Sequence, residues 1–225
     1  MGAIKIDEVV RSRRKTIALV VQPDGRLVVR APLRVSQKII DAFVISKADW
    51  IEKSRQSQVA RRKFFPKRSF ASGELFWYLG KQYPIKVVKS QRPVFQFQLG
   101  FSLDENALPQ AKKQFEKWYR DQARLYLNER VVHYARLYNF HYQKIRVSSA
   151  RTRWGSCSAR GTLSFTWRLI MSPPEIIDYV VIHELAHTIH HNHSPQFWGL
   201  VGSILPDYAE KRKWLKHNSH LFHWD

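Results

Sequence analysis

Hydrophobic residues in the first hundred positions recur over short distances, which predicts strands. Branched residues fill Thr16–Val21 and Leu27–Ala31, and Pro-Asp-Gly at 23–25 predicts a hairpin turn between them. Apolar residues at helical spacing predict one helix from about Ser36 to Gln58. Further strands are predicted at 75–78, 83–88 and 94–99.

Longer stretches with helical periodicity dominate the rest of the chain. An amphipathic helix is predicted from Leu108 to Leu137, followed by strands at Lys144–Ser149 and Thr162–Arg168. Later helices are predicted at Pro195–Leu205 and Asp207–Asn218. We therefore expect an α+β protein in which a strand-rich N-terminal module (residues 1–103) precedes a domain of helices around a small sheet (residues 104–225).

The most informative stretch for function is His183-Glu184-Leu185-Ala186-His187. On a helix, residues four apart share one face, so both histidines can reach one metal ion while Glu184 lies close enough to take a proton from metal-bound water. The preceding run, residues 176–182, is strongly apolar and predicts a buried helix. Buried polar side chains need partners, and a metal ion would supply one.

Catalytic zinc usually keeps three protein ligands and one open position, so a third ligand is required. His190 would continue the face of His183 and His187, and three ligands in a row cannot converge on a tetrahedral ion. His193 can bind if the helix ends first, and Asn192 is a candidate for that turn because asparagine tolerates a left-handed backbone. Glu210, on a later predicted helix, is the alternative third ligand.

Two arginines precede the second strand of the small sheet. Arg151 and Arg153 fall in a predicted loop, where a guanidinium group could hold an anionic substrate group or a developing oxyanion; the alternative is pairing with Glu175 or Asp178. The strand from Leu163 to Trp167 is our candidate for a sheet edge that aligns an extended substrate.

Positive charge is concentrated in the N-terminal half. The chain carries 38 basic and 18 acidic residues, a net charge of +20, and residues 1–100 hold 21 of the basic and 7 of the acidic ones. The stretch from Lys53 to Arg68 contains seven basic residues and no acid. We consider two interpretations of this charge, contact with nucleic-acid phosphates and a solvated basic surface. The candidate nucleic-acid contacts are Arg61, Arg62, Lys63, Lys67 and Arg68.

Composition argues for a folded protein of the cytoplasm. No apolar run approaches the ~18 residues needed to cross a bilayer, and the first residues lack the apolar core of a signal peptide. The single cysteine, Cys157, excludes an internal disulfide and suits a reducing compartment. We expect no membrane partner, and the sequence does not indicate an oligomeric state.

The run RTRWGSCSARGTLSFTWRLIMSPPEIIDYVVIHELAHTIHHNHSPQFW, residues 151–198, resembles the YgjP-like metallopeptidase family, which is related to the WLM and SprT-like zincins. The segments RSRRKTIALVVQPDGRLVVRAP and SGELFWYLGKQYPIKVV are similar to that family as well. The resemblance implies a zincin-like C-terminal domain, with His183, His187 and His193 as metal ligands and Glu184 as the catalytic base. It implies much less about the substrate.

Taken together, these features predict a hydrolase with one Zn²⁺ ion, most simply a metallopeptidase acting on a peptide or protein. A metal-dependent phosphohydrolase acting on nucleotides or other phosphate substrates is the alternative, because the same chemistry can attack phosphorus. A nucleic-acid-binding module with a structural zinc is a weaker alternative, since such zinc sites are usually closed by cysteines.

Overall fold

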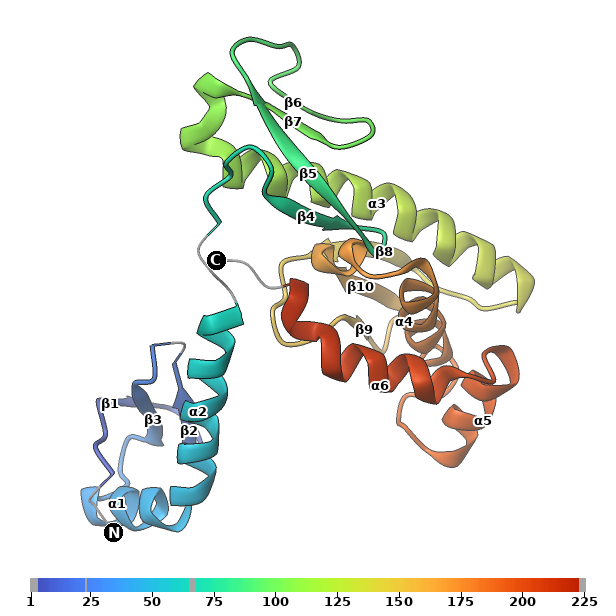
Figure 1. Ribbon diagram of the computed structural model, residues 1–225. Helices are drawn as coiled ribbons and strands as arrows, with labels where there is room; N and C mark the ends of the chain where they lie inside the picture. The colour runs from blue at the N-terminus through green and yellow to red at the C-terminus, as the bar shows by residue number, and fades with distance from the viewer. Residues whose placement is uncertain (1–3, 23, 65–67, 223–225) are drawn as a thin grey trace. The chain divides into compact units, whose positions relative to one another are not determined.

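The computed structural model describes residues 4–22, 24–64 and 68–222, without the side chains of residues 57–64, 219 and 220. The described chain is an α+β protein, as predicted, and it forms two compact units (Figure 1): unit 1, residues 1–67, and unit 2, residues 68–225. Each unit has a hydrophobic core built from its own residues.

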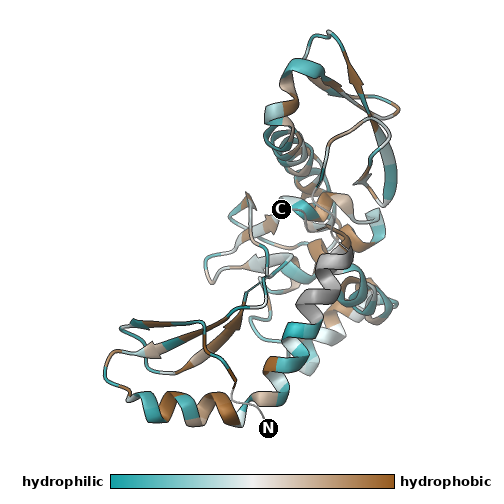
Figure 2. Ribbon diagram, turned by 60° about the vertical axis from the view of Figure 1, so that its left-hand side comes forward, coloured by the Kyte–Doolittle hydropathy of each residue, from teal (hydrophilic) through white to brown (hydrophobic). Residues whose placement is uncertain are grey.

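Unit 1 contains a three-stranded sheet and two helices. Strands β1 (Glu8–Ser12), β2 (Ala18–Val21) and β3 (Leu27–Pro32) lie in the order β1-β3-β2, with β1 parallel and β2 antiparallel to β3. The predicted hairpin is therefore confirmed as β2 and β3, whereas β1 was not predicted. In Figure 2 these strands carry mostly hydrophobic colours.

The single helix predicted at 36–58 is two helices, α1 (Gln37–Ser46) and α2 (Ala48–Phe64), so this prediction was wrong in length and continuity. The break is at Lys47, whose N–H donates back to Val44 O at 3.1 Å and whose carbonyl accepts from Ile51 N at 3.0 Å. The turn allows both helices to contribute to one core: Ile40 and Val44 from α1 and Ile51 from α2 are buried there.

The first sheet of unit 2 packs on the long helix. Strands β4 (Leu75–Tyr78), β5 (Lys81–Val88), β6 (Phe95–Phe97) and β7 (Phe101–Asp104) lie in the order β4-β5-β7-β6. The short 3-10 helix η1 (Glu105–Gln110) leads into α3 (Ala111–Leu137). Phe76 and Phe101 lie 4.1 and 4.9 Å from the ring of Phe115 on α3. Because these strands share a core with α3, the compact units divide at residue 67, not at the predicted residue 103.

The second sheet of unit 2 has the order β8-β10-β9. β8 (Lys144–Ser148) is parallel and β9 (Gly155–Cys157) antiparallel to β10 (Thr162–Thr166). The strand predicted as a sheet edge, Leu163–Trp167, corresponds to β10 and is central, so that prediction was wrong. The edge strands are β8 and β9, and β9 is only three residues long and shows no hydrophobic alternation.

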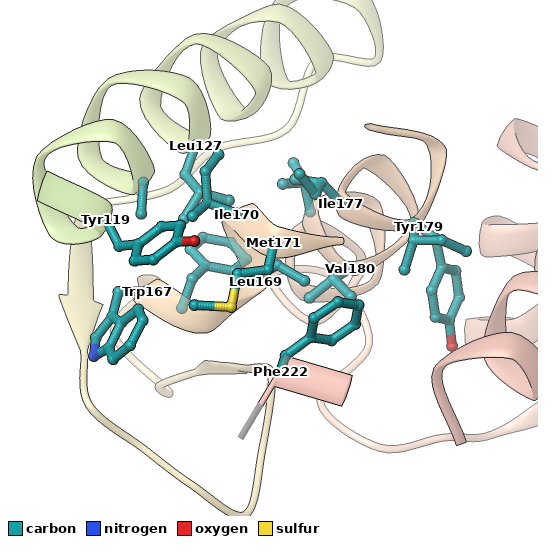
Figure 3. Close-up of a cluster of buried hydrophobic side chains, with 14 of the residues drawn as sticks. Tyr119, Leu127, Trp167, Leu169, Ile170, Met171, Ile177, Tyr179, Val180 and Phe222 are labelled. Carbon is teal, nitrogen blue, oxygen red and sulfur yellow. The ribbon is translucent and has the colours of Figure 1, made fainter. Parts of the chain in front are cut away.

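The remaining elements are helices. After β10 come η2 (Trp167–Met171), α4 (Pro174–Ala186), α5 (Pro195–Ile204), α6 (Tyr208–Asn218) and η3 (Ser219–Phe222). Of these, η2 and α4 contact α3, and α5 and α6 contact α4. Figure 3 shows Tyr119 and Leu127 of α3 gathered with Ile170 of η2 and Ile177 of α4. Among the described residues, no helix is both long and apolar enough to span a bilayer.

A candidate metal centre at the end of α4

Helix α4 is buried around most of its circumference, which explains its continuous apolar sequence. Pro173 is the N-cap residue and Pro174 opens the first turn, where its missing N–H is not needed. Asp178 anchors the helix to α3 by accepting two hydrogen bonds from Arg130, from Nε at 2.7 Å and from Nη2 at 2.9 Å. Asp178 therefore pairs with Arg130, and not with Arg151 or Arg153, which the sequence offered as partners.

Three histidines meet where α4 ends. His183 lies in the last turn of α4, His187 is its C-cap residue, and His193 lies in the loop before α5. Their ring centroids form a nearly equilateral triangle with sides of 4.8, 4.9 and 5.0 Å. His183 Nε2 and His193 Nε2 are 3.1 Å apart. Two nitrogens on one tetrahedral zinc ion would be about 3.3 Å apart, so the donor set fits such an ion.

The chain leaves the helix earlier than the sequence suggested. Helix α4 ends at Ala186, and His187 begins the turn, so Asn192 does not end the helix. Asn192 Oδ1 instead accepts from Ser194 N at 3.3 Å within the loop that presents His193. His190 contributes its carbonyl, which lies 2.9 Å from His187 Nδ1. A proton on that Nδ1 leaves Nε2 of His187 available to a metal ion.

Of the two third-ligand candidates, only His193 joins this group. Within the described part of the chain, the histidines at 183, 187 and 193 are the residues whose ligand atoms converge, all within 4.8 Å of one another. Glu210 is exposed on α6 and lies outside the group.

Two aromatic side chains of α5 hold the three imidazoles. The fully buried ring of Phe197 stacks on His187 at 4.5 Å and meets the rings of His183 and His193 at 4.9 Å each. Trp198 stacks on His193 at 5.5 Å. Ser194 caps α5 by accepting from Phe197 N at 3.3 Å, which fixes the start of the helix directly after His193. Neither aromatic residue was identified from the sequence, although both directly follow the histidine-rich run.

Trp198 also contacts helix α6. The Tyr208 ring stacks on it at 5.2 Å, and the Arg212 guanidinium lies 4.8 Å from its ring centroid. Cations favour such positions over an aromatic face. Helix α6 therefore supports the aromatic side chain that contacts His193.

Glu184 is buried beside the histidine triangle, and its Oε2 has no hydrogen-bond partner among the described residues. Gly155 of the edge strand β9 faces it so closely that a Cβ there would lie 2.4 Å from Glu184 Oε1. Burial raises the pKa of Glu184 to about 8, and the positive charge of Arg153 opposes this rise. The missing side chain at position 155 makes room for this carboxyl group.

Burial favours the neutral form of His183 and His187, which is the form that metal binding requires. Burial, followed by the charges of His187, His193 and Arg212, lowers the pKa of His183 to about 3. Burial also lowers the pKa of His187.

The other predicted site residues are not among the side chains whose ligand atoms converge in the described part of the chain. Arg151 and Arg153 are exposed, and of these Arg153 acts electrostatically on Glu184. Arg68 is engaged within unit 2: its Nη1 donates to Glu74 Oε1 at 3.2 Å and its guanidinium lies 4.7 Å from the Phe76 ring centroid. The side chains of Arg61, Arg62 and Lys63, and all of Lys67, lie outside the described residues.

A pocket of about 340 Å³ lies beside the turn that follows His187. The lining includes two histidines and one arginine and no acidic residue. It consists of His141, Tyr142, Gln143, Ala159, Arg160, Gly161, Thr188 and His191.

Comparison with known proteins gives one family and one solved structure. A family model described as "YgjP-like, metallopeptidase domain" matches residues 15–218. The crystal structure of the metallopeptidase zymogen of Pyrococcus abyssi abylysin aligns at 22% sequence identity, covering 40% of this chain and 93% of that chain, with a TM-score of 0.36. The comparison with curated proteins gives no match.

Proposed function

The chain belongs to the YgjP-like metallopeptidase family, and from that premise we propose that this metal-dependent hydrolase is a zinc peptidase with Glu184 as its general base. The observation that carries the proposal is the juxtaposition of a three-histidine donor set and a buried carboxyl group with an unpartnered oxygen. A structural zinc site would leave that carboxyl group without a role.

His183, His187 and His193 would hold the ion. Zinc bound there would acidify a water molecule and polarise a substrate carbonyl. The unsatisfied Oε2 of Glu184 accepts the proton of that water, and the resulting carboxylic acid donates it to the leaving amine nitrogen. Close packing against Gly155 keeps the carboxyl group from rotating away.

We infer that an extended peptide lies along the edge strand β9. Within the described residues, one side of this strand has no partner strand and β10 lies on the other, and its Gly155 faces Glu184. A peptide added to this edge would bring a backbone carbonyl alongside the carboxyl group. The nearby pocket lined by Arg160, His141 and His191 would suit an acidic substrate side chain, so peptides with Asp or Glu are the first to test.

Phosphate ester or anhydride hydrolysis is the second candidate, and the observation that favours it is the same acid-free pocket next to the histidine triangle. Guanidinium and imidazole groups bind phosphate as readily as carboxylate. Nucleoside triphosphates therefore belong in the same test.

The test is activity profiling of zinc-loaded protein on unfolded proteins, peptides and nucleoside triphosphates, with two variants and metal analysis. Glu184→Gln should keep about one zinc per chain and lose turnover by at least 100-fold, because the amide cannot accept the proton. His187→Ala should lose the metal itself. Full activity in the glutamine variant would exclude the proposed mechanism, and turnover confined to nucleotides would establish the second candidate.

A further inference from the structure

One end of the unit 1 sheet gathers two loops and a helix start. Strands β1 and β3 are parallel, so the loops that follow them leave the sheet at the same end. Arg11 joins these loops: its Nη1 donates to the carbonyls of Pro32 and Leu33, each at 3.3 Å, and of Val35 at 2.6 Å. Helix α1 begins directly afterwards, with Ser36 as its N-cap residue.

Seven basic side chains belong to this end of the sheet, and we call them the basic patch: Arg11, Arg13, Arg14, Lys15, Arg30, Arg34 and Lys38. Six of the seven are exposed. The exception is Arg14, which is half-buried and whose Nε has no hydrogen-bond partner among the described residues.

Acidic residues do not neutralise the patch. Between residues 10 and 38 the sole acid is Asp24, which pairs with Arg26 at 2.6 Å in the turn at the other end of β3. The nearest acids in sequence outside that stretch are Glu8, where β1 begins, and Asp41, which accepts from Gln37 Nε2 at 2.8 Å. None of the seven takes part in an ion pair within the described part of the chain.

Crowded like charges repel one another unless an anion lies between them. The start of α1 adds the partial positive charge of its free N–H groups at the same place. The cations are spread over a strand, two loops and a helix start instead of converging on one point, which suits a chain of phosphates better than a single small anion.

We propose that the basic patch binds the phosphate backbone of a nucleic acid without reading its bases. Residues 10–38, which contain the patch, include no aromatic residue on which a base could stack. Lysines and arginines at a strand end offer point charges to phosphates. An anionic membrane is a poorer fit, because the large apolar side chains exposed near these cations, Val10, Leu33 and Ile39, come from a strand, a turn and a helix instead of one amphipathic helix.

This surface differs from the cluster at residues 61–68 singled out from the sequence. Arg68 of that cluster is engaged by Glu74 and Phe76 in unit 2. The basic patch lies wholly within unit 1 and requires neither a metal ion nor the proposed peptidase activity.

The experiment is a salt titration of binding between the full-length protein and a fluorescent 20-base-pair duplex of mixed sequence. The patch variant is Arg13→Gln/Lys15→Gln/Arg34→Gln, which spares the loop-joining Arg11. The matched control is Lys112→Gln/Lys113→Gln/Lys117→Gln, which removes three exposed cations of α3 and changes the net charge equally. Circular dichroism and thermal unfolding of both variants verify that they fold.

We expect the slope of log affinity against log salt to fall by about 2 to 3 in the patch variant, at ~0.9 for each phosphate that the protein no longer neutralises, and by less than 1 in the control. No measurable duplex binding by the wild type, or equal changes in both variants, would overturn the proposal. A third variant, Arg61→Gln/Arg62→Gln/Lys63→Gln, completes the set. A loss of duplex binding that occurs only in this third variant would also overturn the proposal. Patch-dependent binding to phosphatidylserine vesicles without duplex binding would assign the surface to a membrane instead.

Discussion

Gly155 is a residue of the candidate site that leaves no room for a larger side chain. Alanine there would place a methyl group 2.4 Å from Glu184 Oε1 and 2.7 Å from Cδ, so the buried carboxyl group must move. We expect Gly155→Ala to lower kcat/KM by about 100-fold, the effect of a displacement near 1 Å. Zinc content should stay unchanged, because the atoms nearest to the added methyl group all belong to Glu184 and not to a histidine. Overpacking should reduce the free energy of unfolding by about 1–3 kcal/mol.

Gly199→Ala is the matched control for that prediction. Gly199 lies in α5, and an added Cβ there meets nothing within 4 Å. Alanine in a helix should raise stability slightly and leave turnover intact. Equal activities in the two glycine variants would show that the contact between β9 and Glu184 does not matter for catalysis.

Sequence reasoning at the residue scale works best where chemistry is local. Helical spacing predicted that His183 and His187 share one face, and in the structure His193 converges with them. The metal-binding roles of the three histidines and the catalytic role of Glu184 stay predictions. Gly155 and Phe197 could not be found this way. Their importance comes from contacts with residues on other elements, which no spacing rule encodes.

Helix α5 positions the third histidine through its first turn. His193 is exposed in a loop, and the stacked Trp198 limits the rotamers of its imidazole. We expect Trp198→Leu to weaken zinc affinity by about 10- to 100-fold, the usual effect of removing a group that orients a ligand. Zinc competition with a chromophoric chelator measures this without any activity assay.

Two further variants define what that result means. Trp198→Phe should recover most of the affinity, because a smaller ring can still stack. Trp50→Leu, at a half-exposed position in α2, should leave affinity unchanged. If the leucine variant at position 198 bound zinc like the wild type, the stacking would have no part in holding the ligand.

Asp104 ends strand β7 and is the N-cap residue of η1, and its carboxylate joins the start of η1 to the loop between β5 and β6. Its Oδ1 accepts from Asn106 N and its Oδ2 from Gln91 N, both at 2.9 Å. These hydrogen bonds lower the pKa of Asp104 below 3.8, and the bond from Gln91 N has the larger effect. Their contribution to stability is therefore fully present above pH 3.8 and is lost as pH falls through the lower pKa of the folded protein.

Urea unfolding of the wild type and of Asp104→Asn between pH 2 and 6 measures this contribution. The wild type should be the more stable protein above about pH 4, and the difference should shrink as the carboxylate becomes protonated. A difference that is the same at every pH would mean that the charge of Asp104 contributes nothing.

Strong periodicity predicted most elements, and the failures have physical causes. Helix α3 carries a long amphipathic pattern. Its start was predicted within three residues, and its end was predicted at the observed residue, Leu137. β9 escaped prediction because its three residues show no hydrophobic alternation, and β7 was not separated from the strand predicted at 94–99. The break at Lys47 could not be predicted from the sequence, because apolar residues of both helices face the same core and continue one pattern.

At the scale of the whole molecule, each unit has a separate core. The core of unit 2 runs from Phe70 to Phe222 and that of unit 1 from Ile4 to Ile51, with no residue in common. The compact units divide at residue 67, whereas the sequence placed a module boundary at residue 103, because the packing of β4–β7 on α3 joins residues that are far apart in sequence. Local patterns reveal strands, but they do not reveal which helix covers them.

We therefore expect a protein that begins at residue 68 to fold and to bind zinc like the full chain. All three histidines, Glu184 and the aromatic residues that hold them belong to unit 2. Zinc affinity within twofold of the full-length value, with cooperative thermal unfolding, is the expected result. Loss of the zinc site in the shortened protein would mean that unit 1 is needed to form it.

The placement of the histidines also bears on the order of folding. The three imidazoles and the two rings beneath them all come from residues 183–198, so only short loops must close to bring them together. Gly155 and Glu184 are separated by almost thirty residues of sheet and helix, and contacts that distant form later. During refolding in the presence of zinc, the ion should be captured before turnover appears, and the delay between the two signals would time the docking of β9 onto α4.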